Sequence, residues 1–351
     1  MSTKNSNKLS ILIASYLEPE YVHMIQELDK RIIVNYHPYL LRQPRYPADH
    51  DGHPISRTKK QEEQWIQLLK QADILFDFDQ THLHDLPEIN PDIKWIQATS
   101  SGIGQLIDDL NYHTRLPNTI FTTASGIHAQ PLAEFCLLSM LMHSRKLTYM
   151  MNRQSQKHWE RYAGNDLLEK TVLILGMGKI GKRIAEIAHT LGMKVIGITR
   201  TKSHRGNIQI DDIVIDTSKH LYKYLNKTDY LILSVPHTPQ TDKLIGETEL
   251  NMLPKGAILI NIARGNVVDE QALIKSLYKG QLDGAYLDVF EKEPLPKESP
   301  LWSMPNVLIS PHSASTSIRE NYLITELFCD NLKLYLKNQP LINVFNTKRL
   351  Y

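Results

Sequence analysis

Residues 171–181 read Thr-Val-Leu-Ile-Leu-Gly-Met-Gly-Lys-Ile-Gly, and this stretch decides the fold. The apolar run 172–175 predicts a buried parallel strand. Three glycines follow it at GxGxxG spacing, and a pattern of helical periodicity opens directly after them. A second strand is expected at 194–198, so the segment predicts a complete βαβ unit.

Each glycine of this turn meets a separate physical requirement of dinucleotide binding. Gly176 allows the tight strand-to-helix turn, Gly178 lets backbone N–H groups approach a pyrophosphate, and Gly181 lets helix and strand pack closely. The helix that opens at Lys179 and Ile180 adds the partial positive charge of its N-terminus. We assign these five residues to cofactor binding. The alternative, a glycine-rich turn without a ligand, fits the flanking strands and helix less well.

Composition and charge narrow the classes of protein to consider. The 351 residues fit two domains, and 42% hydrophobic and 22% charged residues are ordinary for a globular protein. A net charge of +2 gives no electrostatic argument for nucleic acid or an anionic membrane. Cys136 and Cys329 lie in apolar helical contexts, which favours buried thiols in a reducing compartment. The apolar run near the N-terminus is too short for a signal peptide or membrane span, so a cytoplasmic location is expected.

Alternating strand and helix patterns up to residue 124 indicate a first α/β domain. Strands are expected at 9–16, 31–36, 74–78, 94–98 and 119–123, and helices at 18–28 and 59–71. A polar, proline-rich connection spans 37–56 and carries His50, Asp51 and His53. Their spacing matches no metal-ligand motif, so we expect a surface loop there and no metal site.

The rest of the chain predicts a second α/β domain. A long apolar helix is expected at 129–151, buried between domains or subunits. Later strands are expected at 230–235, 257–263, 284–290 and 307–310, and helices at 269–278 and 317–336. We predict two doubly wound parallel-sheet domains. A Rossmann NAD(P)-binding domain, 125–317, is inserted in a flavodoxin-like substrate domain, 1–124 and 318–351.

Three polar residues follow late strands of the second domain. Arg264, Glu293 and His312 all leave the carboxyl edge of one sheet, where ligands of open α/β sheets bind. Each alone also fits a structural role, as a helix-start arginine, a solvated glutamate or a loop histidine. Their common edge beside the glycine turn is the argument for a site.

The chemistry of these groups suits hydride transfer to a small acid. Histidine titrates near neutral pH and can pass a proton to or from an alcohol oxygen. A carboxylate beside it favours the imidazolium. An arginine fork pairs with a substrate carboxylate and can polarise the neighbouring carbonyl. With a nicotinamide as hydride carrier, the site would hold a 2-keto or 2-hydroxy acid.

The ordered motifs resemble those of the D-isomer-specific 2-hydroxyacid dehydrogenases, in particular a glyoxylate/hydroxypyruvate reductase-like subgroup. They are the turn 176–181, Ser234-Val235-Pro236-His237-Thr238-Pro239-Gln240-Thr241, Asn261-Ile262-Ala263-Arg264-Gly265, Leu287-Asp288-Val289-Phe290 with Glu293-Pro294-Leu295, and Ser310-Pro311-His312. The resemblance is strong over about residues 90–320 and is architectural before them. Residues 126–134 and Gln105 depart from the usual family pattern, which leaves substrate specificity open.

The resemblance implies a role for each matching residue. Arg264 would bind the substrate carboxylate and carbonyl, and His312 would be the acid/base with Glu293 as its partner. Asp288 would contact the nicotinamide amide, and further cofactor contacts would come from Pro236, Thr241 and Ala263. From the other domain, backbone N–H groups of Ser101 and Gly102 would hold the substrate carboxylate.

The resemblance also implies a homodimer built through the long helix, with substrate in an interdomain cleft that closes. In some members an aromatic residue of a second copy lines the pocket, and Trp159 is the candidate here. A plain dimer contact is an equal alternative for this residue.

The end of the second cofactor strand indicates which nicotinamide is used. An NAD enzyme would usually place Asp or Glu near Thr199 to bind the ribose 2′-hydroxyl. Arg200, Thr201 and Lys202 instead offer positive charge and a hydroxyl to a 2′-phosphate. We therefore favour NADP, with NAD or dual use as the alternative.

Other functions remain open at this point. A nicotinamide-dependent sensor or corepressor-like interaction protein would keep the same site residues, although no disordered partner-binding extension is seen. A phosphoglycerate dehydrogenase-like enzyme is a further alternative, weakened because no regulatory domain follows. A reductase of small 2-keto acids is the leading interpretation.

Overall fold

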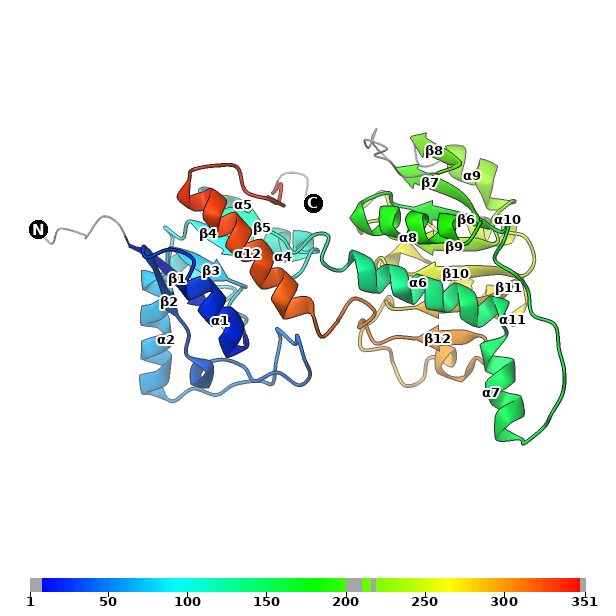
Figure 1. The fold of residues 1–351 in the computed structure, drawn as a ribbon, viewed down its shortest axis with the longest axis horizontal. Helices are drawn as coiled ribbons and strands as arrows, with labels where there is room; N and C mark the ends of the chain where they lie inside the picture. Colours follow the sequence, from blue (N-terminus) through cyan, green and yellow to red (C-terminus); the bar gives the residue numbers. More distant parts are fainter. Residues whose placement is uncertain (1–7, 200–209, 216–218, 348–351) are drawn as a thin grey trace, which may run out of the picture. The chain divides into compact units, whose positions relative to one another are not determined.

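A computed structural model describes residues 8–199, 210–215 and 219–347 (Figure 1). The chain divides into two compact units. Unit 1 comprises residues 1–127 and 316–351, and unit 2 comprises residues 128–315. The divisions lie within three residues of the expected ones at 124/125 and 317/318.

Unit 1 contains a five-stranded parallel sheet with the order β2-β1-β3-β4-β5. This order is the flavodoxin-like one. The strands are β1 (Leu9–Ile13), β2 (Ile32–Asn35), β3 (Ile74–Phe76), β4 (Trp95–Gln97) and β5 (Ile120–Thr122). The helices are α1 (Pro19–Gln26), α2 (Lys59–Gln71), α3 (Leu86–Ile89), α4 (Gly104–Asp109), α5 (Tyr112–Arg115) and α12 (Glu320–Leu336), with a 3₁₀ turn at Pro38–Leu40.

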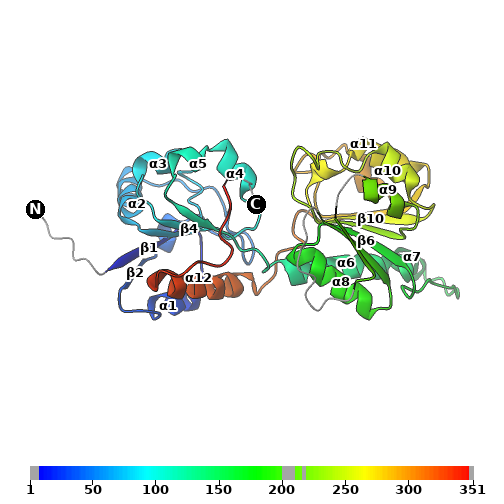
Figure 2. The same ribbon diagram turned by 90° about the horizontal axis from the view of Figure 1, so that it is seen from above.

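Both faces of this sheet are covered, as a parallel sheet requires. Figure 2 shows α1 and α12 along one face and α2 to α5 along the other. Successive side chains of β1 point to opposite faces of the sheet. Ile11 and Ile13 pack into the core on the α12 side, and Leu12 packs into the core on the other side together with Trp65 of α2. The helix α12 thus returns the chain to unit 1.

Unit 2 contains a seven-stranded parallel sheet with the Rossmann order β12-β11-β10-β9-β6-β7-β8. The strands are β6 (Thr171–Leu175), β7 (Lys194–Thr199), β8 (Asp212–Ile215), β9 (Tyr230–Leu233), β10 (Ala257–Asn261), β11 (Leu282–Leu287) and β12 (Val307–Ile309). The helices are α6 (Ala129–Ser144), α7 (Leu147–Ser155), α8 (Lys179–Thr190), α9 (Lys219–Leu225), α10 (Glu247–Met252) and α11 (Glu270–Tyr278), with 3₁₀ turns at Gly265–Val267 and Pro300–Ser303.

The second sheet is also sandwiched between helices. In Figure 2, α6 and α8 cover one face, and α9, α10 and α11 cover the other. Every residue of β6, β9 and β10 is buried, which explains the continuous apolar runs of these strands. The prediction of two parallel-sheet α/β domains is therefore confirmed.

The prediction of one helix over 129–151 is wrong. The chain forms α6 up to Ser144 and a separate α7 from Leu147. Lys146 has a φ of +52°, a left-handed conformation that ends a right-handed helix. Its backbone N–H donates to the carbonyl of His143 at 3.1 Å, which closes the end of α6.

Three elements between the second cofactor strand and residue 252 were not identified from the sequence. They are β8, α9 and α10. The last two are short, with seven and six residues, and short helices carry little periodic signal.

Candidate active site

The glycine turn of unit 2 has the geometry that phosphate binding requires. Gly176 has a φ of +101°, and a Cβ there would lie 2.6 Å from the carbonyl oxygen of Ser234. A Cβ on Gly181 would lie 2.0 Å from the carbonyl oxygen of Gly176, so only glycine lets α8 start this close to β6. Among the described residues, no atom lies within 4 Å of the position that a Cβ on Gly178 would take. The backbone at Gly178 is thus open to a ligand, and the turn fits a pyrophosphate.

The start of α8 lies directly after this open backbone. Lys179 is the first residue of the helix, and desolvation lowers the pKa of its ammonium group. Ile180 packs against the hydrophobic core on the α6 side of the sheet. The neighbouring strand β7 ends at Thr199, the position at which an NAD enzyme usually carries an acidic residue that binds the ribose. The predicted 2′-phosphate residues Arg200, Thr201 and Lys202 lie outside the described residues.

Two loops at the carboxyl edge are held by internal hydrogen bonds. The buried Thr241 hydroxyl donates to the carbonyl of Pro236 at 2.7 Å and accepts from the N–H of Thr238 at 2.8 Å. The N–H of buried Ala263 donates to Oδ1 of Asn261 at 3.0 Å. The predicted cofactor contacts Pro236, Thr241 and Ala263 therefore lie in ordered loops after β9 and β10.

His312 and Glu293 form a direct pair. Nδ1 of His312 lies 2.7 Å from Oε2 of Glu293, and the other oxygen, Oε1, accepts the N–H of Phe290 at 3.0 Å. His312 has a φ of +54° and lies three residues after β12. Both side chains keep access to solvent, at 47% for His312 and 35% for Glu293. A paired imidazole with an exposed ring is able to exchange a proton with a bound molecule.

The electrostatics of this pair favour the charged form of both partners. The hydrogen bond that His312 donates to Glu293 raises the pKa of His312 above 6.5. The charges of Glu293 and Asp288 raise it further, while desolvation and the charge of Arg264 lower it. Burial raises the pKa of Glu293, but the bonds from His312 and the Phe290 amide outweigh it, so this pKa is lowered. Both shifts favour a carboxylate on Glu293 beside an imidazolium on His312.

Arg264 follows β10 and is brought to the same place by the packing of two loops. A Cβ on Gly265 would lie 1.8 Å from the carbonyl carbon of Phe290, so the loops after β10 and β11 pass in direct contact. Nη1 of Arg264 donates to the carbonyl of Ala263 at 2.7 Å. Desolvation lowers the pKa of this guanidinium, and the charges of Glu293 and Asp288 oppose that shift. The predicted arginine, carboxylate and histidine therefore lie near one another.

Asp288 has a structural role that the sequence did not reveal. The residue is buried, and its Oδ1 accepts from the Ser310 hydroxyl at 2.6 Å and from the N–H groups of Ser313 and Ala314 at 2.9 Å each. Its own carbonyl accepts the N–H of His312 at 2.9 Å. Asp288 thus fixes the backbone that presents His312. In the sequence, only the serines on both sides of His312, Ser310 and Ser313, could have indicated this hydrogen-bond network.

Ser101 and Gly102 belong to the other unit. They lie between the end of β4 and the start of α4, and both are exposed. The N–H of Ala124 donates to the carbonyl of Ser100 at 3.1 Å and holds this loop against the segment after β5. The loop therefore stands at the carboxyl edge of the unit 1 sheet, as predicted from its position after a strand.

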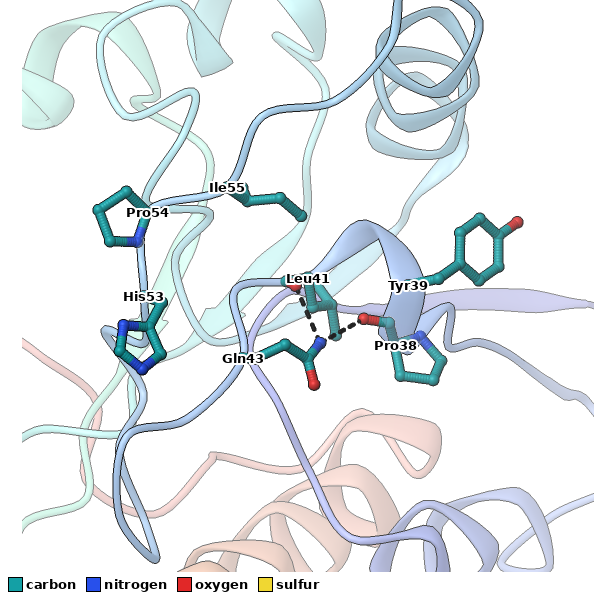
Figure 3. Close-up of a pocket in the computed structure, with 7 residues that line it drawn as sticks. All are labelled: Pro38, Tyr39, Leu41, Gln43, His53, Pro54 and Ile55. Atoms are coloured by element: carbon teal, nitrogen blue, oxygen red, sulfur yellow. Dashed lines mark hydrogen bonds between the residues drawn. The ribbon is translucent and has the colours of Figure 1, made fainter.

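A hollow of about 420 Å³ lies on the proline-rich connection of unit 1, away in sequence from every predicted site residue. Figure 3 shows its lining, Pro38, Tyr39, Leu41, Gln43, His53, Pro54 and Ile55. Nε2 of Gln43 donates to the carbonyls of Pro38 and Leu41, at 2.8 and 3.1 Å, which closes the loop on itself. This hollow does not contain the acid/base pair.

The described residues also bear on membrane insertion and on metal binding. Within 8–199, 210–215 and 219–347, no helix is long and apolar enough to cross a membrane. Over the same residues, no group of three or more His, Cys, Asp or Glu side chains could hold a metal ion. Cys136 and Cys329 are both buried free thiols, and desolvation raises the pKa of each.

Comparison with known proteins identifies the family. The family model for the D-isomer specific 2-hydroxyacid dehydrogenase, NAD binding domain, matches residues 137–314. Glyoxylate reductase of Aeropyrum pernix is 31% identical over 271 residues, which cover 75% of this chain and 79% of that protein. Glyoxylate/hydroxypyruvate reductase B of Pectobacterium carotovorum is 35% identical over 228 residues, which cover 63% and 70%.

A solved structure supports the same assignment over the whole length. The D-isomer specific 2-hydroxyacid dehydrogenase of Xanthobacter autotrophicus, crystallised with NADPH and MES, has a TM-score of 0.76 at 26% identity. The match covers 98% of this chain and 100% of that one. The family model, the archaeal relative and this likeness agree, and the chain belongs to the NAD(P)-dependent D-isomer-specific 2-hydroxyacid dehydrogenases.

Proposed function

We propose that this protein reduces small 2-keto acids to D-2-hydroxy acids, with NADPH as the favoured cofactor. The observation that carries the proposal is the 2.7 Å pair of His312 and Glu293 beside Arg264. An acid/base group and a fixed cation are what the reduction of a keto acid requires of the protein. The relatives named glyoxylate reductase and glyoxylate/hydroxypyruvate reductase support this substrate class.

The proposed mechanism assigns one task to each side chain. The nicotinamide supplies a hydride to C2 of the keto acid when it is bound. His312 gives its proton to the C2 oxygen, which becomes the hydroxyl of the product, and regains a proton from solvent. Glu293 keeps the imidazole ring oriented and raises the pKa of His312, which favours the protonated form that donates. In the reverse direction the neutral imidazole accepts the same proton.

Substrate orientation is assigned to three groups. The Arg264 guanidinium binds the substrate carboxylate and polarises the C2 carbonyl. Backbone N–H groups of Ser101 and Gly102 hold the carboxylate from the substrate domain.

Cofactor binding is assigned to the residues around the turn in unit 2. The open backbone at Gly178 supports pyrophosphate binding, together with Gly176, Lys179, Ile180 and Gly181. The ordered loops that carry Pro236, Thr241 and Ala263 would line the cofactor further along the edge. Asp288 would contact the nicotinamide amide in addition to holding the His312 loop.

The preference for NADPH rests on the end of β7. Thr199 stands there in place of a carboxylate that would repel a 2′-phosphate, and Arg200, Thr201 and Lys202 follow in the sequence. Thr199→Asp combined with Arg200→Ala is expected to shift the ratio of kcat/KM toward NADH. Steady-state kinetics with both cofactors measure this ratio, and an unchanged ratio would contradict the assignment.

We also propose a homodimer in the cytoplasm. Trp159 is 96% exposed, and Met151 and Leu168 of the same unit are 60% and 65% exposed. Large exposed apolar side chains in neighbouring segments favour a protein partner, here a second copy. Light scattering should give a mass near twice 40.4 kDa. If Trp159 lines the pocket of the second copy, Trp159→Ala should raise KM while that mass is kept.

One assay tests the proposed activity. Oxidation of NADPH, and of NADH in parallel, is followed with glyoxylate, hydroxypyruvate, pyruvate, phenylpyruvate and a branched-chain keto acid. Turnover with the small members of this panel is expected. Tight NADPH binding without turnover of any keto acid would contradict the proposal and favour a nicotinamide sensor.

A further inference from the structure

A cluster of buried polar side chains lies at the carboxyl edge of the unit 1 sheet. Ser15 follows β1, and Asp77 directly follows the neighbouring strand β3. His50 reaches them from the proline-rich connection 37–56. Ser15 and Asp77 are 4% and 3% exposed. The acid/base pair of unit 2 has no part in this cluster.

The contacts within the cluster are incomplete. Nδ1 of His50 lies 3.3 Å from the Ser15 hydroxyl and 3.9 Å from Oδ2 of Asp77. Oδ1 of Asp77 accepts the N–H of Phe78 at 2.8 Å. Among the described parts of the chain, Nε2 of His50 and Oδ2 of Asp77 are buried atoms without a hydrogen-bond partner. Such atoms are costly unless a ligand or water satisfies them.

The burial and the backbone conformation of Asp77 are both unusual for a residue with a carboxylate side chain. Burial raises the pKa of Asp77, and the charge of His50, the Phe78 amide and the hydroxyls of Ser15 and Thr99 oppose this. Its φ is +71°, a strained value for a residue other than glycine. Strain and burial at one carboxylate are typical of a functional site, because stability alone would select against both.

The turn that carries His50 is held in one conformation. Oδ2 of Asp49 accepts the backbone N–H and Nε of Arg45, at 2.9 and 2.6 Å. Oδ1 of Asp49 accepts Nη2 of Arg45 and the N–H of Gly52, at 2.9 and 3.1 Å. Gly52 has a φ of +64°, and a Cβ there would lie 2.7 Å from Cβ of Arg42. His50 is therefore fixed in place before any ligand binds.

The cluster shares its edge with the loop proposed to hold the substrate carboxylate. The N–H of Asp77 donates to the carbonyl of Gln97 at 2.8 Å, at the end of β4. Thr99 acts on the Asp77 carboxyl and stands two residues before Ser101. The cluster and the loop of Ser101 and Gly102 thus follow the neighbouring strands β3 and β4 at the same edge of the sheet.

We propose that Ser15, His50 and Asp77 form a subsite that binds a hydroxyl on C3 of a 2-keto acid. A hydroxyl can donate to Oδ2 of Asp77 and accept from Nε2–H of His50, so one group satisfies both buried atoms. A hydrogen or a methyl at C3 would satisfy neither. A carboxylate there would place a second negative charge beside Asp77. The inference rests on the proposed keto-acid reduction and specifies its substrate class, 3-hydroxy-2-keto acids.

The test compares two substrates that differ at C3. Hydroxypyruvate carries the hydroxyl and glyoxylate has no C3, so the ratio of their kcat/KM values isolates the subsite. His50→Ala and Asp77→Asn should each lower this ratio about 10- to 100-fold, as expected for a lost hydrogen bond to a buried polar group. The loss should come mainly from a higher KM for hydroxypyruvate. Asparagine tolerates a positive φ, which favours folding of the Asp77 variant.

Controls separate the subsite from a structural role and from the reaction itself. His53→Ala changes an exposed histidine of the same connection and should leave the ratio unchanged. Thermal melting shows that each variant is folded, and His50→Gln decides the matter if Asp77→Asn does not fold. Wild-type turnover of glyoxylate with a ratio that no variant alters would contradict the subsite alone. No turnover of either acid by the wild type would overturn the proposed function together with the subsite.

Discussion

The carboxyl edges of the two sheets carry titratable groups in opposite conditions. At the edge of unit 2, His312 is paired with Glu293, and Oδ1 of Asp288 accepts three hydrogen bonds. At the edge of unit 1, His50 and Asp77 each keep a buried atom that has no hydrogen-bond partner among the residues that the structure describes. The first edge is arranged for proton transfer without a ligand. The second is complete only when a ligand or water supplies the missing hydrogen bonds.

We interpret this difference as a division of tasks, with proton transfer at the edge of unit 2 and substrate recognition at the edge of unit 1. Proton transfer needs a pKa that is set in advance, which a fixed partner such as Glu293 provides. Substrate choice needs groups that gain their partners from the correct ligand and lose them with the wrong one. We therefore expect changes in unit 2 to affect every keto acid alike and changes in unit 1 to affect some more than others.

The largest effect is expected from removal of the acid/base group. His312→Ala should lower kcat about 1,000-fold with every keto acid, because the proton for the C2 oxygen has no other fixed source. NADPH affinity, measured by fluorescence titration, should stay near that of the wild type. His189→Ala, at an exposed histidine of the same unit, is the control. Near-native turnover by His312→Ala would remove the distinction between the two edges.

A smaller loss of activity is expected from replacement of the Arg264 guanidinium. Arg264→Lys keeps the positive charge but loses bidentate pairing, so kcat/KM should fall about 100-fold, chiefly through KM. The loss should be equal for glyoxylate and hydroxypyruvate, since both carry the same carboxylate. A loss confined to hydroxypyruvate would place substrate discrimination in unit 2 and contradict the comparison.

Two glycines of the same turn should differ in what they affect. Gly181→Ala places a Cβ 2.0 Å from the carbonyl oxygen of Gly176. The resulting overpacking should cost about 1–3 kcal/mol of stability, visible in denaturant unfolding. Gly178→Ala adds a Cβ that meets no atom of the described part of the chain within 4 Å, so it should leave stability near wild type while weakening NADPH binding. Equal destabilisation by both changes would show that the open backbone at Gly178 is not a ligand site.

The smallest effect is a shift in pH dependence. His312 must be protonated to reduce a keto acid, so kcat/KM for reduction should fall as pH rises through its raised pKa. Glu293→Gln removes the carboxylate that raises this pKa, and the fall should begin at lower pH. Glu298→Gln, at a nearby exposed glutamate, should not move the profile. An unshifted profile in Glu293→Gln would mean that another group provides the proton.

The candidate site residues of unit 2 could be chosen from the sequence for a physical reason. Strands β6, β9 and β10 are buried throughout and read as continuous apolar runs, and close backbone approaches require glycine at positions 176 and 181. Residues that follow such strands fall at the ligand edge by topology alone. Arg264, Glu293 and His312 could therefore be selected without a structure.

Other features depend on contacts that no local pattern encodes. The helix break at Lys146 involves neither glycine nor proline. The helical pattern of apolar residues therefore continues past it in the sequence and predicted one helix where the structure has two. The cluster of His50 with Asp77 joins residues 27 positions apart through a turn fixed by Asp49. The sequence predicted a surface loop over 37–56, and His53 is exposed there, but no local pattern indicated that the His50 side chain is only 13% exposed.

The most direct test of the whole account is chiral analysis of the product formed from hydroxypyruvate and NADPH by the wild-type protein. In the proposed mechanism, Arg264 fixes the carboxylate and His312 protonates the C2 oxygen from one side, which leaves one face of C2 open to hydride. The account predicts NADPH oxidation with formation of D-glycerate alone. Formation of L-glycerate or a mixture, or no oxidation by protein that binds NADPH, would contradict it.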